Sequence, residues 1–140
     1  MDTKPQLFVA AKGFISRDGK VLIIRESTVH RTNSQVGKFD VVGGRLTPGE
    51  TIEECLRREV QEEVGLTVTV GKPFFVNESR NTVHGEHWQI IRIFFDCRCD
   101  ARQITLNEEH DTFLWIDPAN YRTENVIENL YPAFEAYLHR

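Results

Sequence analysis

The chain has 140 residues, enough for one domain with a single hydrophobic core and too few for two substantial domains. Apolar residues make up 40% and charged residues 27%, a balance typical of ordinary globular proteins rather than disordered or membrane-embedded ones. The formal net charge of -4 argues against a general nucleic-acid binder, which needs a basic face to hold the phosphate backbone.

Signals for export or membrane insertion are not visible in the sequence. Residues 1–6 contain no apolar segment behind a basic start, and no stretch approaches the roughly 20 apolar residues that span a bilayer. Cys55, Cys97 and Cys99 are an odd number in a mid-sized chain, unlike the disulfide framework of a small secreted domain. We therefore expect a cytoplasmic protein with no membrane partner and with reduced thiols. Cys97 and Cys99 are expected on the buried face of a strand rather than in half of a zinc site.

Two apolar runs open the chain, over residues 7–15 and 21–24. Asp18-Gly19 separates them, which predicts an antiparallel hairpin. The polar segment 27–38 has no periodicity and is predicted to be a surface loop of the kind that borders a binding site. A short strand is predicted over residues 39–42.

A helix is predicted from Glu50 or Thr51 to Val64. Glycines and a proline break regular structure just before it, and apolar residues then recur at helical spacing. Gly65 supplies the stop, as glycine commonly does at the end of a helix.

Strand and loop patterns alternate in the second half of the chain. Residues 66–76 predict two short strands or one strand bent at an edge, and residues 88–99 predict the longest strand. Another strand is predicted over residues 113–116. The polar segments 78–86 and 100–111 are predicted to be connecting loops.

The C-terminal segment, residues 124–138, predicts an amphipathic helix, because its apolar residues recur at helical spacing. Helices that alternate with strands predict one α/β (α+β) domain, in which helices cover a mixed sheet.

Three glutamates converge on one side of the predicted helix at residues 50–64. With about 100° per residue, Glu62 and Glu63 fall on either side of Glu59, and this stripe overlaps the apolar face. Glutamate favours helices, and such charge runs usually face water. Here, however, like charges stand three and four residues apart near the negative end of the helix dipole.

A divalent cation would resolve this conflict, because it offsets the repulsion between neighbouring carboxylates. Ligands that are all carboxylate oxygens suit Mg²⁺ or Mn²⁺ rather than zinc or copper. Mg²⁺ usually keeps several waters and shares its coordination shell with substrate phosphates. The stripe therefore indicates metal-dependent phosphate chemistry.

The same helix belongs to a longer motif that runs from Gly44 to Leu66. Five residues separate Gly44 from Glu50, and seven more precede the run Arg-Glu-Val-Gln-Glu-Glu-Val-Gly-Leu, which begins at Arg58. At every defining position this resembles the Nudix box, in which a glycine and a glutamate at fixed spacing precede Arg-Glu-x-x-Glu-Glu-x-Gly. One departure is that the preceding strand commonly contains Trp-x-x-Pro-Gly-Gly, whereas here it contains Phe-Asp-Val-Val-Gly-Gly.

The resemblance implies an α/β/α sandwich and a single Nudix domain over residues 1–140, with its box at 44–66. It implies that Glu59, Glu62 and Glu63 bind Mg²⁺, and that the substrate is a nucleoside diphosphate linked to another moiety. It also implies bracing roles for Glu50 and Arg58, and turns permitted by Gly44 and Gly65.

These ligands predict hydrolysis in which a water molecule attacks phosphorus in line. The general base is either Glu59 or a glutamate from a distant loop. Of the loop pair Glu108 and Glu109, the second is the first choice for a base or added metal ligand. A solvated loop acid is the competing interpretation of Glu109.

Three further residues are candidates for substrate binding: Arg25, Gly44 and Phe39. Arg25 ends a predicted strand and carries a guanidinium group that fits a phosphate, although arginines at exposed strand ends are common. Phe39 is a candidate for contact with a base or sugar, and packing is its alternative role.

Two classes of function fit these residues: a pyrophosphohydrolase, and a catalytically silent nucleotide sensor with the same fold. The intact glutamates favour the enzyme. A small nucleotide is the expected partner, with no nucleic acid, and the protein is expected to be a monomer or homodimer. The family markers for ADP-ribose and dinucleoside polyphosphates, a proline and a tyrosine, are missing around residues 81–83, so the substrate stays open.

Overall fold

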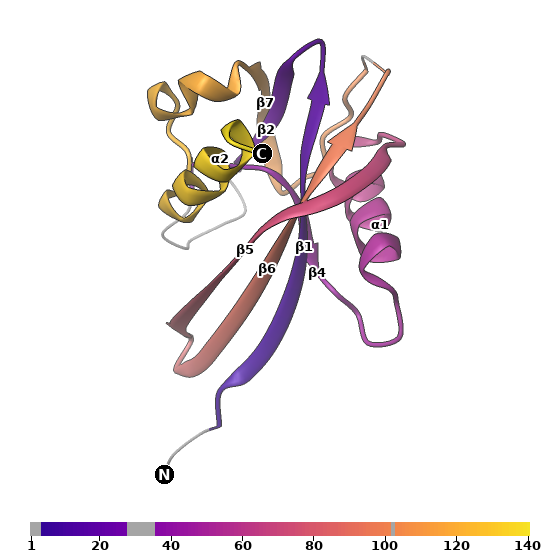
Figure 1. Ribbon diagram of the computed structural model, residues 1–140. Coiled ribbons are helices and arrows are strands. Elements are labelled where there is room, and N and C mark those ends of the chain that lie inside the picture. Colours follow the sequence, from indigo (N-terminus) through magenta and orange to yellow (C-terminus); the bar gives the residue numbers. More distant parts are fainter. Residues whose placement is uncertain (1–3, 28–35, 102) are drawn as a thin grey trace.

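Seven strands form one mixed sheet in the computed structural model, which describes residues 4–27, 36–101 and 103–140 (Figure 1). The strands are β1 (Gln6–Arg17), β2 (Lys20–Glu26), β3 (Phe39–Asp40), β4 (Val42–Arg45), β5 (Thr69–Val83), β6 (Glu86–Arg98) and β7 (His110–Ile116). Their order is β3-β2-β1-β6-β5, with β4 paired to β1 and β7 paired to β2. Strands β1 and β6 run parallel, and the other strand pairs are antiparallel. The predicted mixed sheet is confirmed.

Strand β1 divides the sheet, because two different strands share one of its edges. Ala10 to Gly13 pair with β4, whereas Ser16 and Arg17 pair with β2. Strands β2, β3 and β7 therefore diverge from β4 on this side. The divergence leaves the end of β4 facing the helix that follows it in the chain.

Helix α1 (Ile52–Val64) covers one face of the sheet. Its N-terminus is fixed by a capping box, in which the Thr51 side chain accepts a hydrogen bond from Glu54 N and the Glu54 carboxylate accepts one from Thr51 N. The helix ends at Gly65, whose φ of 70° is left-handed. Both ends agree with the sequence prediction. The apolar side of the helix packs on a core of aliphatic residues and cysteines.

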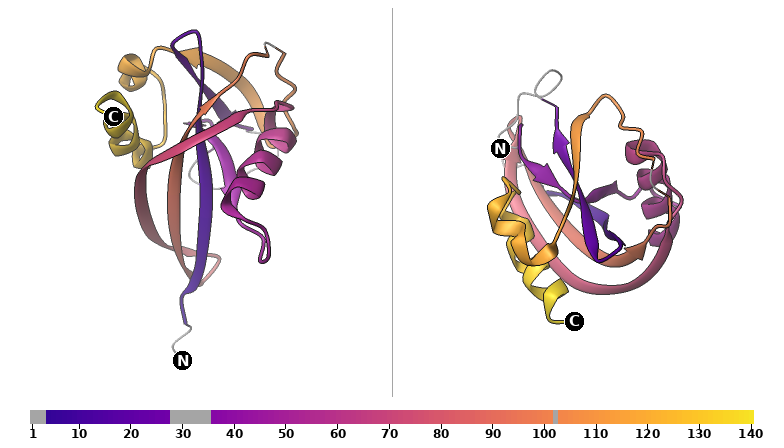
Figure 2. Two further views of the ribbon diagram at one scale, coloured as in Figure 1. Left: turned by 45° about the vertical axis from the view of Figure 1, so that its right-hand side comes forward. Right: turned by 90° about the horizontal axis from the view of Figure 1, so that it is seen from above.

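The C-terminal elements cover the opposite face of the sheet (Figure 2). They are two 3₁₀ helices, η1 (Pro118–Thr123) and η2 (Glu128–Leu130), followed by α2 (Tyr131–Leu138). Phe14 anchors this second core, with its ring 4.7 Å from that of Phe134 and 5.0 Å from that of Tyr137. Helices on both faces of the sheet confirm the layered α+β arrangement.

The predicted start of the C-terminal helix is wrong, since α2 begins at Tyr131 and not near residue 124. The backbone upstream is held extended by β3: Phe39 N donates to Asn125 O at 2.8 Å, and Ile127 N donates to Phe39 O at 3.0 Å. These long-range bonds replace the local bonds that a helix would make. Spacing alone cannot reveal this competition.

The loop predicted over residues 78–86 is also wrong, because β5 continues to Val83 and turns into β6 through His84 and Gly85. Polar residues occupy both faces of this part of β5, so the sequence shows no alternation. The backbone ladder to β6 holds the strand extended nevertheless. Farther upstream the predicted bend is confirmed by shifts of register on either side of Pro73.

Other predictions for the fold have clear outcomes. The opening hairpin and the strands over 88–99 and 113–116 are confirmed. Cys55, Cys97 and Cys99 are buried free thiols, as expected. Most of the predicted loop over 27–38 lies outside the described residues. Within the described part of the chain, no helix combines the length and apolar character that crossing a membrane requires.

Candidate active site

The last turn of α1 directs the Glu63 carboxyl group toward the end of β4. Its Oε1 accepts a hydrogen bond from Gly43 N at 2.8 Å, and the residue is only 8% exposed. Burial raises the pKa of Glu63 to about 8, although the Lys12 ammonium and the Gly43 N–H both act to lower it. In the absence of a bound metal ion, burial therefore favours the protonated form of this carboxyl group at neutral pH.

The Glu59 carboxylate lies against the backbone of Gly44. A Cβ atom at Gly44 would lie 2.5 Å from Glu59 Cδ and 2.6 and 2.7 Å from its two oxygens. Glycine is therefore required here to leave room for the carboxylate. The side chain of Glu59 is 17% exposed, and its Oε1 accepts a hydrogen bond from Arg58 Nη1 at 2.9 Å.

Arg58 ties the preceding loop to the helix. It donates from Nη2 and Nε to the two oxygens of Glu50, at 2.7 and 3.1 Å, and from Nη1 to Glu62 at 3.3 Å. These bonds to Arg58, and one from the Thr47 N–H, lower the pKa of Glu50 to about 2. Arg58 thus links Glu50, which precedes the helix, to helix α1. Glu62 is the most exposed of the three box glutamates at 56% of its side chain.

A distant loop brings Glu109 and His110 to Glu63. The ligand atoms of these three side chains lie within 4.8 Å of one another, with His110 Nε2 at 3.8 Å from Glu63 Oε2. The loop docks on the end of α1 through backbone bonds from Thr105 N to Val64 O and from Asn107 N to Glu63 O, at 3.0 and 3.3 Å. Glu109 is thus placed beside the box, and Glu108 is not part of this group.

Asn107 orients both Glu109 and His110. Its Oδ1 accepts a hydrogen bond from Glu109 N and lies 3.1 Å from His110 Nδ1. Because an acceptor faces Nδ1, the proton of a neutral His110 sits there and Nε2 presents its lone pair toward Glu63. A role for His110 was not predicted from the sequence. The available signal was a histidine directly after two acidic residues.

Lys12 is a buried cation in the first apolar run, and its position near the site was also not predicted from the sequence. It is 8% exposed, and its Nζ lies 3.0 Å from Asp40 Oδ2. A lysine at this depth needs an anionic partner, and Asp40 supplies it. The positive charge that acts on Glu63 therefore comes from Lys12 on strand β1.

The remaining candidates for substrate binding have other contacts. Arg25 Nε donates to Asp111 Oδ1 at 2.7 Å, which pairs β2 with β7. Phe39 is 7% exposed and belongs to the core under α2, so the structure supports its packing role. Gly44 borders Glu59, as described above.

The match to a family model decides the classification. The description of that model is NUDIX domain, and it covers residues 6–136. The chain belongs to the Nudix family. By family it is a pyrophosphohydrolase, and the box residues occupy the end of β4, the loop after it and helix α1.

Known relatives agree with this Nudix classification. The nucleoside triphosphatase NudI of Enterobacter sp. (strain 638) is 35% identical over 99 residues, which cover 66% of this chain and 70% of that protein. The NudI protein of Escherichia coli K12 is 36% identical over 89 residues, which span only 63% of its length.

Solved structures show the same fold. The MutT protein from Methanosarcina mazei Go1 superposes with a TM-score of 0.82 at 24% identity, covering 99% of this chain and 97% of that one. The E. coli ORF135 protein gives a TM-score of 0.71 at 23% identity, with 96% of this chain and 91% of that chain covered. At this level of identity the likeness concerns the fold alone.

Substitution of the adjacent glycines Gly43 and Gly44 should separate effects on the site from effects on the fold. Gly44→Ala places a Cβ against the Glu59 carboxylate, a movable side chain, so activity should fall at least about tenfold with little loss of stability. Gly43→Ala should destabilise the protein by about 2 kcal/mol or more, because its φ is 145° and the new Cβ would lie 2.1 Å from Ala11 O. Chemical denaturation and turnover of both variants test this pair, and equal losses of stability would contradict it.

The raised pKa of Glu63 predicts how stability depends on pH in the absence of metal. The unfolded side chain ionises near 4.5, whereas the folded one holds its proton up to about pH 8. Between these two pH values the folded state binds more protons than the unfolded state. The free energy of unfolding therefore falls as the pH rises through this window. Thermal melts in a chelator should show this fall, and Glu63→Gln should flatten it.

The exposed Glu53 of the same helix supplies the control for this experiment. Glu53→Gln should leave the pH profile of the melting temperature as in the unmodified protein. If Glu63→Gln and Glu53→Gln gave the same pH profile, the buried carboxyl group would not be the source of the pH dependence of the melting temperature.

Proposed function

We propose that this chain hydrolyses a pyrophosphate linkage in a small nucleoside diphosphate derivative, with Mg²⁺ held by Glu59, Glu62 and Glu63. The observation that carries the proposal is the burial of Glu63 against Gly43 N, beside Glu59 and Glu109. A buried carboxyl group needs either a proton or a cation, and a second acidic side chain nearby favours the cation.

The donor atoms at this site fit a hard divalent ion. Glu59, Glu62 and Glu63 offer carboxylate oxygens from the helix, which leaves water and substrate phosphates to complete the coordination. Mn²⁺ satisfies the same oxygen ligands. Bound at this position, the ion would neutralise charge on the pyrophosphate and make water more acidic.

Glu109 is proposed as the base that takes a proton from the attacking water. It lies in a loop that Asn107 orients, and a ligand oxygen of its carboxylate lies within 4.8 Å of the ligand atoms of Glu63 and His110. Glu63 keeps one oxygen on Gly43 N, so its second oxygen, near His110 Nε2, faces the site. Lys12 and Arg58 limit the build-up of negative charge around these acids.

A nucleoside triphosphate is the substrate class we propose first. The NudI relatives are nucleoside triphosphatases by name, and the formal net charge of -4 argues against a polynucleotide substrate. The alternative is a nucleotide sensor without turnover, which shares the fold but has no need for a buried acid facing the loop glutamate. A cytoplasmic location, and one domain over residues 1–140, remain predictions from the sequence.

The decisive experiment is a panel of nucleoside triphosphates, nucleotide sugars and dinucleotides, assayed with Mg²⁺ and read by product chromatography. Release of a nucleoside monophosphate from one class would establish the activity and the substrate. Absence of turnover together with absence of Mg²⁺ binding in calorimetry would favour the sensor.

Single glutamate substitutions should separate ligands from base. Glu63→Gln should lower kcat at least about 100-fold, because a metal ligand that stabilises transition-state charge is lost. Glu62→Gln should also abolish metal-dependent turnover while leaving the fold as stable or slightly more stable, since repulsion is relieved. Isothermal titration with Mg²⁺ should show weaker binding for both, and Glu53→Gln should behave as the unmodified protein.

Glu109→Gln should act differently if Glu109 is the base. It should lower kcat by about 10²-fold or more and remove the acidic limb of the pH-rate profile, with Mg²⁺ affinity reduced less than in Glu63→Gln. An unchanged limb with strongly weakened Mg²⁺ binding would instead make Glu109 a metal ligand.

A further inference from the structure

Strand β5 is an edge strand whose two halves differ in protection. The first half contains Gly71-Lys72-Pro73 and two shifts of register, and Phe74 and Phe75 pack toward the core under α2. Lysine, proline and bulges are the features by which proteins prevent edge strands from pairing with other chains. This half of the edge is therefore blocked.

The second half of β5, Val76 to Val83, has none of these features. Its register with β6 is continuous over these residues, and it contains neither lysine nor proline. Among the described residues, β5 pairs with β6 and with no other strand. The outer edge of this half thus presents a regular row of backbone donors and acceptors.

We propose that this half of β5 pairs antiparallel with the same strand of a second copy of the chain. A twofold axis perpendicular to the sheet relates the copies, so each residue lies opposite a residue on the same face of the partner strand. With this symmetry, the residue at the centre of the strand pair lies opposite the same residue of the second copy. The charged side chains then determine which residue occupies the centre.

Glu78 and Arg80 are adjacent on one face of β5, with side chains 50% and 74% exposed. Centring the pair on Ser79 places Glu78 of each copy opposite Arg80 of the other. Centring it on Glu78 or on Arg80 would instead place like charges opposite each other, which is destabilising. Within one copy the two side chains already lie 3.7 Å apart, so pairing around Ser79 produces an alternating cluster of four charges.

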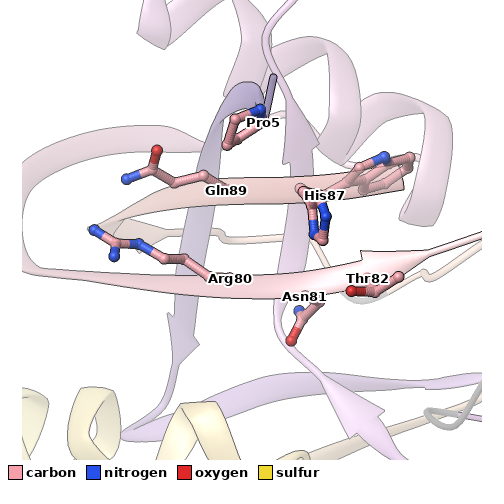
Figure 3. A pocket seen from close by; sticks show the side chains of 7 residues that line it. Pro5, Arg80, Asn81, Thr82, His87 and Gln89 are labelled. Atoms are coloured by element: carbon pink, nitrogen blue, oxygen red, sulfur yellow. The ribbon is translucent and has the colours of Figure 1, made fainter. Parts of the chain in front are cut away.

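A pocket beside this edge supports the same register. Its volume is about 300 Å³, and it is lined by Pro5, Arg80, Asn81, Thr82, His87, Trp88 and Gln89 (Figure 3). Val76, an apolar side chain that is 57% exposed, lies on the same face of β5 as Arg80 and Thr82. Pairing centred on Ser79 brings Val76 of one copy opposite Thr82 of the other, at the pocket.

Sedimentation equilibrium of the full chain, over a wide range of concentration, tests the proposal. A single strand pair is a small interface, so we expect a reversible dimer with twice the 16.2 kDa mass of one chain at high concentration. Glu78→Lys and Arg80→Glu should each raise the dissociation constant about tenfold or more, because like charges then face each other twice. The double variant Glu78→Lys/Arg80→Glu should restore the original value.

Lys20→Glu is a matched control, since it inverts one exposed charge in the β1–β2 hairpin, at the far end of the molecule from the β5–β6 turn (Figure 1). It should leave association unchanged. A protein that stays monomeric at its highest soluble concentration would overturn the proposal, as would a dimer that both single variants leave intact. Unchanged melting temperatures would show that the variants fold.

Discussion

The Glu63 carboxyl group is buried between the last turn of α1 and strand β4, where Gly43 N is its hydrogen-bond donor. This one contact places an acid against β4 at a residue that pairs with Lys12 of β1. Burial makes its charged form costly, which is why its pKa rises to about 8. A bound cation would offset that cost, which is why the metal is proposed to bind at this contact.

The surrounding residues hold this acid in position and limit its freedom. Gly44 leaves space for the Glu59 carboxylate, and Arg58 links that carboxylate to Glu50 in the loop. The loop at 107–110 then docks on the end of α1 and adds Glu109 and His110. The site is therefore assembled from a rigid loop and helix and from a second segment more than forty residues downstream.

The same sheet that supports the site has one unprotected edge. Strand β5 is shielded where it approaches α2 and open where it extends with β6 away from both helices (Figure 1). Residue Ser79 of this edge accepts a hydrogen bond from Arg92 on β6 at 2.9 Å. The strand that would pair with a second copy is therefore bonded to β6 through a side-chain hydrogen bond as well as through the backbone.

The sequence by itself determined the elements whose signals are local. Thr51 and Gly65 define helix α1 because capping depends on neighbouring residues, and the spacing of Glu59, Glu62 and Glu63 follows from helical geometry. Only the tertiary structure decided the rest. Long-range backbone bonds from Phe39 prevent a helix at residue 124, the ladder to β6 keeps polar residues 78–82 in a strand, and docking of a distant loop brings His110 to Glu63. Each of these depends on partners far along the chain, and periodicity reports only on neighbours.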